Sequence, residues 1–290
     1  MVNRATMVRS QIPVSVLILT LNEEHDLPRC LETVKWSDDV VVLDSGSSDR
    51  TVEIAAAWNC RVVPRKFDNW AAHQNWALQN VEFKNKWVLN LDADERISNE
   101  MAVELQRVVS EDWPYKAFRM RRKDYLYDTW LKHATFYPTW LVRLYQPGAV
   151  NFRRLVNPVA DVDGPVGTLA GHIEHYPFSK GLSHWIARHN SYSTFEAMEY
   201  EKRKWPSFGE FLSKDSNRRR QAAKALFARA PFRPVLKFSY LYFVHRGFLD
   251  GRPGFTYCLL QSIYEYFISV KIVELRRVTC GAGSECARKG

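Results

Sequence analysis

The chain has 290 residues, of which 46% are apolar and 25% are charged. This composition excludes a chain that is disordered throughout, because the apolar side chains suffice for a sizeable core. The formal net charge of +9 indicates phosphate-bearing partners, and charge alone does not choose between nucleic acid, anionic lipid and a phosphorylated small molecule.

Strands and helices are predicted to alternate along the first hundred residues. Residues 13–20 read PVSVLILT, a continuous apolar and β-branched run that is typical of a strand covered on both faces. Periodicity and capping residues predict further strands over 39–43, 61–63 and 87–91, and helices over 24–35, 48–58, 69–79 and from Ser98 onward. Alternating elements joined by short loops predict an α/β fold with a mostly parallel sheet and helices on both of its faces.

The pattern is looser beyond residue 115. Strand-like segments span 115–125 and 137–145, while residues 151–171 read as loop with short strands. Residues 183–201 return to a helical pattern.

The C-terminal part is basic and aromatic. Residues 214–237 carry the basic side chains Arg218, Arg219, Arg220, Lys224, Arg229 and Arg233. One face of the helix expected over 255–273 carries Leu259, Ile263, Tyr266, Phe267, Val270 and Val273. This amphipathic region suits an anionic membrane surface, and the alternative is an ordinary helical region packed on the core.

The sequence shows no membrane-spanning segment and no disulfide scaffold. No stretch reaches the roughly 18 uninterrupted apolar residues that a spanning helix needs. The apolar run over 12–21 follows Arg4 and Arg9 but lacks a small-residue cleavage site, so a buried strand explains it better than a secretory signal. Five cysteines without a CxxC motif fit a reducing compartment. We therefore expect a cytoplasmic protein.

Polar clusters follow three of the predicted strands. They are residues 20–23 after the first, residues 44–49 after the second and residues 92–95 after the fourth. Ligands of such sheets bind beyond the carboxyl ends of the strands. We therefore expect the three clusters to form one pocket.

Asp92 and Asp94 are the residues most suggestive of chemistry. Side chains alternate along a strand, so two aspartates spaced by one residue can point the same way where the strand ends. Two carboxylates suit Mg²⁺ or Mn²⁺, which retain open positions for phosphate oxygens. The competing interpretation is a solvated acidic turn that caps the next helix. For Asp44, a contact to a nucleoside likewise competes with an ordinary turn.

Four sequence blocks together resemble family 2 glycosyltransferases. They read PVSVLILTLNEE, VVVLDSGSSDRTVEIA, NWAAHQNWALQN and KWVLNLDADERIS, and the resemblance covers roughly residues 13–175. It is strongest to the branch of lipopolysaccharide-core β-glucosyltransferases. It implies an inverting enzyme with a GT-A type of fold, a nucleotide diphosphate sugar as donor and a divalent metal.

The resemblance also assigns residues and boundaries. It places nucleotide and donor contacts at Thr20, Asn22, Glu23, Asp44, Ser45, Gln74, Asn75 and Asp92, and metal ligands at Asp92 and Asp94. Ser45 stands where the family often has a second Asp, and Gln74 stands where the branch often has a basic residue. We expect a tail over 1–12, a GT-A catalytic domain over 13–180, a helical membrane-interface or acceptor region over 181–278 and a flexible tail over 279–290.

The catalytic base is the least defined part of the site. Inversion requires a carboxylate that deprotonates the acceptor hydroxyl. Pro158 replaces the Glu that related proteins show, so Asp161 and then Asp163 are the nearest candidates, with Asp124 as a further one. For His172, His175, His184 and His189, structural roles are favoured over a metal site.

The sequence therefore predicts a peripheral enzyme on the cytoplasmic face of a membrane. It would move a hexose, with a UDP-sugar as the expected donor, to a lipid-linked or cell-surface glycan in polysaccharide or lipopolysaccharide synthesis. The alternatives are a catalytically impaired relative, because of Pro158, and a basic protein that binds membrane or nucleic acid. Nucleotidyl transfer is disfavoured, because the loop after the first strand is acidic and lacks glycine.

Overall fold

The computed structural model describes residues 11–202, 209, 212–213, 219, 230 and 232–286, with side chains described up to residue 278. The chain divides into two compact units, Met1–Gly181 and Leu182–Gly290. Several basic residues singled out above lie outside the described residues: Arg4, Arg9, Arg218, Arg220, Lys224 and Arg229.

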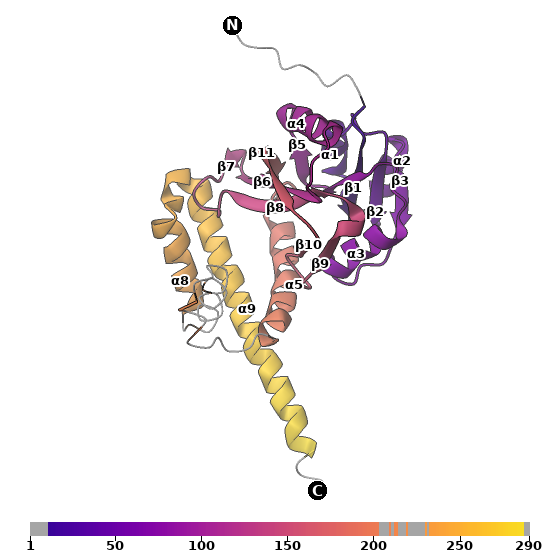
Figure 1. Ribbon diagram of the computed structural model, residues 1–290. Helices are drawn as coiled ribbons and strands as arrows, with labels where there is room; N and C mark the ends of the chain where they lie inside the picture. Colours follow the sequence, from indigo (N-terminus) through magenta and orange to yellow (C-terminus); the bar gives the residue numbers. More distant parts are fainter. Residues whose placement is uncertain are drawn as a thin grey trace. The chain divides into compact units, whose positions relative to one another are not determined.

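The first unit is built on one nine-stranded sheet (Figure 1). Its strands are β1 (Val14–Thr20), β2 (Val40–Asp44), β3 (Arg61–Pro64), β4 (Trp87–Asp92), β5 (Glu95–Ile97), β6 (Ala117–Leu126), β7 (Thr129–Trp130), β8 (Thr139–Tyr145) and β11 (Val166–His175). Their order is β3-β2-β1-β4-β8-β6-β11-β5, and β7 pairs with β6. Strands β3, β2, β1 and β4 are parallel, as are β6 and β11, whereas β8, β5 and β7 run antiparallel to their neighbours.

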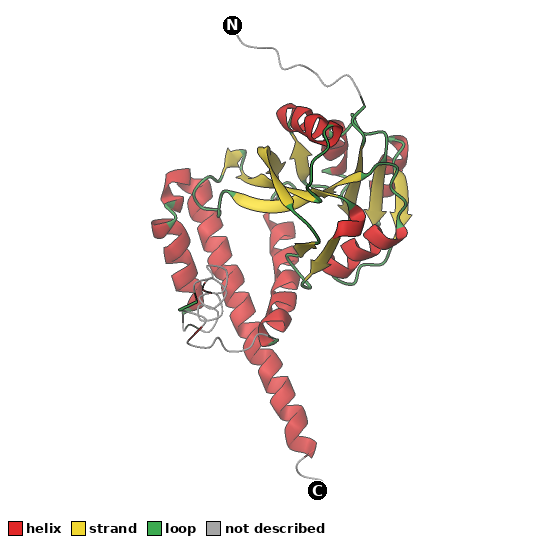
Figure 2. Cartoon of the chain, in the orientation of Figure 1, coloured by secondary structure: helices red, strands yellow, loops and turns green. Residues whose placement is uncertain are grey.

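Helices cover both faces of this sheet (Figure 2). Along β1, Val14, Val16 and Ile18 pack on the face covered by α1 (Leu27–Thr33), α2 (Thr51–Ala57) and α4 (Asn99–Ser110). Leu17 points to the opposite face, where α3 (Trp70–Asn80) packs. Since both faces are covered, β1 is mostly apolar, and every residue from Val14 to Thr20 except the partly buried Leu19 is buried. The predicted α/β fold with a mostly parallel sheet and helices on both faces is confirmed.

Capping side chains position two of these helices. The Asn69 side chain accepts from the backbone N–H of Ala72 and begins α3, and the Ser98 side chain accepts from Met101 and begins α4. α2 starts later than expected, at Thr51, whose backbone N–H donates to Asp49.

Two further strands, β9 (Val150–Arg153) and β10 (Val159–Val162), form a separate antiparallel ribbon after the short 3-10 helix η1 (Pro147–Ala149). The short strands expected within 151–171 are present as β9 and β10, whereas the ten-residue β11, which lies between β6 and β5, is longer than the sequence pattern indicated. Gly167 hides this strand from pattern reading. A Cβ at that position would lie 2.4 Å from the Phe118 ring, so a close packing contact explains the glycine.

The second unit is helical. It contains α5 (Gly181–Glu201), α8 (Arg233–Ser239), the π-helix η2 (Tyr240–Val244), the 3-10 helix η3 (Gly247–Asp250) and α9 (Gly251–Cys286). Ala197 and Tyr200 of α5 pack against Ile268 and Ile272 of α9. Within residues 11–202 and 232–286, no helix is both long and apolar enough to cross a membrane.

The apolar face predicted for α9 points away from its packing partners. Leu259, Ile263, Tyr266, Val270 and Val273 are each between 39% and 58% exposed. Phe267, the sixth residue of the predicted face, is half-buried, and Ile268 and Ile272 of the same helix pack within the second unit.

Candidate functional site

The loop after β2 is organised by one buried carboxylate. Asp44 Oδ1 accepts from Thr20 Oγ1 at 2.9 Å and from Ser47 Oγ at 2.6 Å. Asp44 Oδ2 accepts from the backbone N–H groups of Gly46 at 2.9 Å and Ser47 at 2.8 Å. A carboxylate offers about four acceptor positions, so the protein itself occupies those of Asp44. Gly46 has φ +91°, which allows the turn. In this structure Asp44 shapes the loop.

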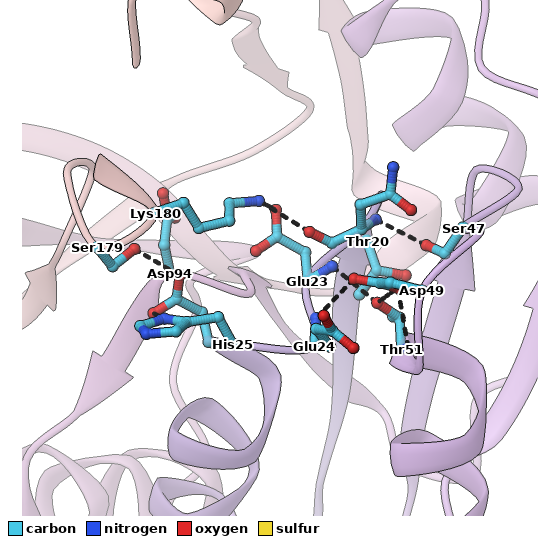
Figure 3. Close-up of polar contacts among 12 residues, drawn as sticks. Thr20, Glu23, Glu24, His25, Ser47, Asp49, Thr51, Asp94, Ser179 and Lys180 are labelled. Carbon is cyan, nitrogen blue, oxygen red and sulfur yellow. Dashed lines mark hydrogen bonds and ion pairs between the residues drawn. The ribbon is translucent and has the colours of Figure 1, made fainter. Parts of the chain in front are cut away.

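The loops after β1 and β2 are joined side by side (Figure 3). The Asn22 backbone N–H donates to Ser47 Oγ at 2.8 Å, and Asn22 Oδ1 accepts from the Ser48 backbone at 2.8 Å. The Glu24 backbone N–H donates to Asp49 Oδ2 at 3.1 Å. Asn22 itself adopts φ 55°, a left-handed conformation that asparagine tolerates better than most residues. The two loops therefore form one braced surface at the strand ends.

Glu23 faces a lysine from the segment after β11. Its Oε1 accepts from Lys180 Nζ at 2.6 Å, and the same Nζ donates to the Asn22 carbonyl at 3.0 Å. Glu23 Oε2 is buried and has no hydrogen-bond partner among the described residues. Burial, followed by the nearby Asp94 carboxylate, raises the pKa of Glu23 to about 7. Figure 3 shows Glu23, Lys180 and Asp94 next to one another.

Asp92 is held by a buried arginine. Arg143 Nη2 of β8 lies 2.7 Å from Asp92 Oδ2 and 2.7 Å from Glu95 Oε1. The other oxygen of Glu95 accepts from the Asp92 backbone N–H at 3.1 Å. Glu95 is fully buried, and burial raises its pKa while Arg143 opposes the rise. This network fixes the end of β4 just before Asp94.

Asp94 is paired with a histidine at the end of β11. His175 Nε2 lies 3.5 Å from Asp94 Oδ2, and His175 Nδ1 lies 2.6 Å from Asp124 Oδ1. Burial acts to lower the pKa of His175 and Arg122 adds to this, but the two carboxylates prevail and raise it to about 9. Burial also acts to raise the pKa of Asp124, yet Arg122 and His175 hold it below its usual range. His175 thus lies between two carboxylates that favour its protonated form.

The residues expected on α3 have different surroundings. Asn75 binds the backbone of Phe152 in both directions, accepting from its N–H at 2.7 Å and donating to its carbonyl at 2.9 Å. Asn75 thereby fastens β9 to α3. The Gln74 side-chain oxygen is buried and has no partner within the described part of the chain. Ser45, in the loop after β2, places its Oγ 3.3 Å from Nε2 of His73, which is also on α3.

The candidate bases lie apart from one another in the fold. Asp161 is on the ribbon strand β10, where it pairs with Arg153 of β9 at 3.0 Å, and both side chains are more than half exposed. Asp163 follows β10, and its backbone N–H donates to Ala149 at 2.8 Å. Asp124 is buried at the end of β6, beside His175.

The described residues contain no three His, Cys, Asp or Glu side chains placed to hold a metal ion. The buried carboxylates nevertheless fit a divalent cation. Glu23 and Asp94 repel one another, and Glu23 Oε2 has no hydrogen-bond partner in the part of the chain that the structure describes. Mg²⁺ is commonly held by one or two carboxylates together with water and substrate phosphates. Asp94, with Glu23 beside it, would hold such an ion together with Asp92. Each aspartate has one oxygen near a basic side chain, Arg143 for Asp92 and His175 for Asp94.

Sequence reasoning brought Thr20, Glu23, Asp44 and Asp94 forward and missed two partners, Arg143 and Lys180. Arg143 had a usable signal, because it is a charged residue within the apolar strand TWLVRLY. Lys180 had none, since it reaches the site only through the position of β11. A structural role was favoured for His175, but its contact with Asp94 was not foreseen.

Comparison with known proteins gives consistent matches. The model of the family described as Glycosyl transferase family 2 matches residues 15–164. "Lipopolysaccharide core biosynthesis glycosyltransferase LpsC" of Rhizobium meliloti (strain 1021) is 24% identical over 274 residues, covering 91% of this chain and 93% of that protein. An "uncharacterized glycosyltransferase" of Rickettsia bellii (strain RML369-C) is 25% identical over 281 residues, covering 90% and 86%. A crystal structure of S. aureus TarS 1–349 has a TM-score of 0.42 at 15% identity, covering 92% of each chain.

Proposed function

The chain belongs to glycosyltransferase family 2, and from this premise we propose that it moves a hexose from a nucleotide diphosphate sugar, with UDP as the expected nucleotide, to a lipid-linked or cell-surface glycan. It is a glycosyltransferase with a GT-A type of fold. A role in lipopolysaccharide or polysaccharide synthesis is supported by the relative from Rhizobium meliloti, whose name assigns it to lipopolysaccharide core biosynthesis and whose similarity spans most of both chains.

The observation that carries the donor assignment is the cluster of Glu23, Asp94 and Lys180 beside the braced loops. The loops after β1 and β2 provide a preformed wall for a nucleoside. Asp94 and Glu23 provide carboxylate oxygens for Mg²⁺ or Mn²⁺, and Lys180 provides a cation for a phosphate. A divalent ion bound there supplies positive charge opposite a departing nucleotide diphosphate.

Inversion at the sugar remains part of this proposal, and it needs a carboxylate base. Asp161 and Asp163 stay our candidates, because their side chains are exposed and open to an acceptor hydroxyl. Asp124 suits the role less well, because it is buried between Arg122 and His175. Burial acts to raise its pKa, but these two partners outweigh burial and the pKa is lowered. A carboxylate held by two cations is a weak proton acceptor.

The Asp94→Asn variant tests the proposed function. The change keeps the size of the side chain and removes its charge, so we expect transfer from a UDP-sugar panel in Mn²⁺ to fall at least about 100-fold. We also expect the thermal stabilisation by UDP with Mn²⁺ to be lost. Asp112→Asn, on an exposed loop, is the matched control and should behave as the wild type. Unchanged transfer and unchanged UDP stabilisation in Asp94→Asn would refute the assignment.

A catalytically impaired relative is the second candidate, and Pro158 is the observation that favours it. Such a protein would bind UDP with Mn²⁺ but show no transfer or donor hydrolysis with any sugar of the panel.

We further propose that the protein works as a peripheral protein on the cytoplasmic face of a membrane, where a lipid-linked acceptor is presented. The exposed apolar face of α9 supports this proposal.

A further inference from the structure

In the second unit, α8, η2, η3 and the start of α9 form a helical hairpin that is held by specific contacts. At its base, Arg233 pairs with Glu265 at 2.5 Å, and Ser262 Oγ donates to a carbonyl of α8 at 2.7 Å. At its tip, a Cβ on Gly254 would lie 2.2 Å from the carbonyl oxygen of Gly247, so two backbone segments touch where only glycine fits. The tip is therefore a defined turn held by tertiary contacts.

This tip, residues 240–256, is called the apex below, and it exposes much apolar surface. Phe243 is 61% exposed, Val244 67%, Phe248 46% and Leu249 55%. The Tyr242 ring supports two of these, with centroids 5.2 Å from Phe243 and 6.1 Å from Phe248. Single exposed apolar side chains are ordinary, whereas a dense group on a fixed turn indicates an interaction site.

The apex is also cationic. Arg246 and Arg252 are exposed beside the apolar group, and Asp250 is the sole acidic residue in the sequence of the apex. A hollow of about 510 Å³ is lined by three aromatic rings together with Arg252. An apolar wall with a guanidinium group at its rim matches an anionic amphiphile, which presents an acyl chain next to a phosphate.

We propose that the apex is a membrane anchor that inserts its apolar side chains into the interface of an anionic bilayer while Arg246 and Arg252 contact lipid phosphates. This inference rests on the peripheral location proposed above and not on sugar transfer. Within the basic and aromatic C-terminal part that the sequence suggested for membrane contact, residues 214–273, it selects one turn whose geometry is defined.

A second copy of the chain fits the apex less well. Two facing apices would bring Arg246 and Arg252 against the same side chains of the other copy, and like charges repel.

Vesicle sedimentation of the full chain tests the anchor. The vesicles contain phosphatidylcholine alone or mixed with phosphatidylglycerol. We expect the double variant Phe248→Ser/Leu249→Ser to bind mixed vesicles at least about tenfold more weakly than the wild type, because two apolar side chains no longer enter the interface. The matched control is Val52→Ser/Val103→Ser, whose apolar side chains are similarly exposed on α2 and α4 of the first unit, and it should bind as the wild type.

A second variant, Arg246→Asn/Arg252→Gln, tests the contribution of the two positive charges. Asn was chosen for position 246 because it tolerates the φ of 60° there. We expect this variant to lose the preference for phosphatidylglycerol and the salt sensitivity of binding. Thermal stabilisation by UDP with Mn²⁺, measured on every variant, reports whether the first unit is intact, and circular dichroism reports the helical unit.

Three results would overturn the anchor: no wild-type binding to mixed vesicles, wild-type binding by folded apex variants, or equal loss in the control pair. A dimer in solution that the serine apex variant dissociates would also overturn it, since the apex would then be an interface between copies. A wild type that binds vesicles but is not stabilised by UDP with Mn²⁺ would instead contradict the proposed donor and leave the anchor standing.

Discussion

Replacing His73 with Asn is expected to remove a specific acid sensitivity of the loop after β2. His73 is buried on α3, with Arg65 Nη1 2.6 Å from its Nδ1 and Ser45 Oγ 3.3 Å from its Nε2. A guanidinium group only donates, so Nδ1 must accept and the ring must be neutral. Protonation would place an N–H of the ring against the N–H of Arg65.

The size of the effect follows from the pKa of His73. Burial, followed by the Arg65 charge, lowers this pKa from 6.5 to about 4. The unfolded chain therefore binds the proton more tightly than the folded one, and stability is lost as pH falls from 6.5 towards 4. Relative to pH 8, this linkage lowers the free energy of unfolding by at most about 2 kcal/mol at pH 5 and about 3 kcal/mol at pH 4.

Urea unfolding of the wild type and of His73→Asn at pH 8, 5 and 4 measures this contribution. Asn keeps an acceptor for Arg65 and cannot titrate, and the other groups cancel in the difference between the two proteins. The variant is expected to lose stability relative to the wild type at pH 8 and to recover this loss on acidification. A difference that stays constant from pH 8 to pH 4 would refute the reasoning.

Two stability predictions follow from buried polar contacts. Arg143→Met should lower the free energy of unfolding, measured by urea titration, by about 3–5 kcal/mol, because Glu95 loses the cation that compensates its burial. Adding Glu95→Leu should restore a large part of this loss. Asn75→Ala should lower the free energy of unfolding by about 2–4 kcal/mol, because the backbone N–H and carbonyl of Phe152 lose their partner. A loss below about 1 kcal/mol in the same titration would contradict a stabilising role of these two hydrogen bonds between α3 and β9.

The first half of the fold was predictable because its signals are local. β1, β2 and β4 are short runs of apolar residues bounded by polar strand ends, and such runs identify strands buried on both faces. The convergence of Glu23 and Asp94 followed from this topology, because parallel neighbours end at the same edge of a sheet.

The remaining features depend on contacts between distant segments. β11 contains Gly167, which is required by the Phe118 ring, and no local pattern reveals that requirement. The apolar stripe on α9 was visible in the sequence, but periodicity does not say whether a stripe meets the core or solvent. The nucleoside contact expected of Asp44 stays a prediction, but no sequence pattern showed that its carboxylate also accepts four hydrogen bonds within the protein.

The position of β11 determines how short an independently folding catalytic fragment can be. The family match ends at residue 164, yet the next strand fills the gap between β6 and β5, and the segment after it delivers Lys180 to Glu23. A fragment cut at residue 164 would detach the edge strand β5 from β6 and leave Glu23 without Lys180. A shortened catalytic fragment should therefore retain every residue through 180.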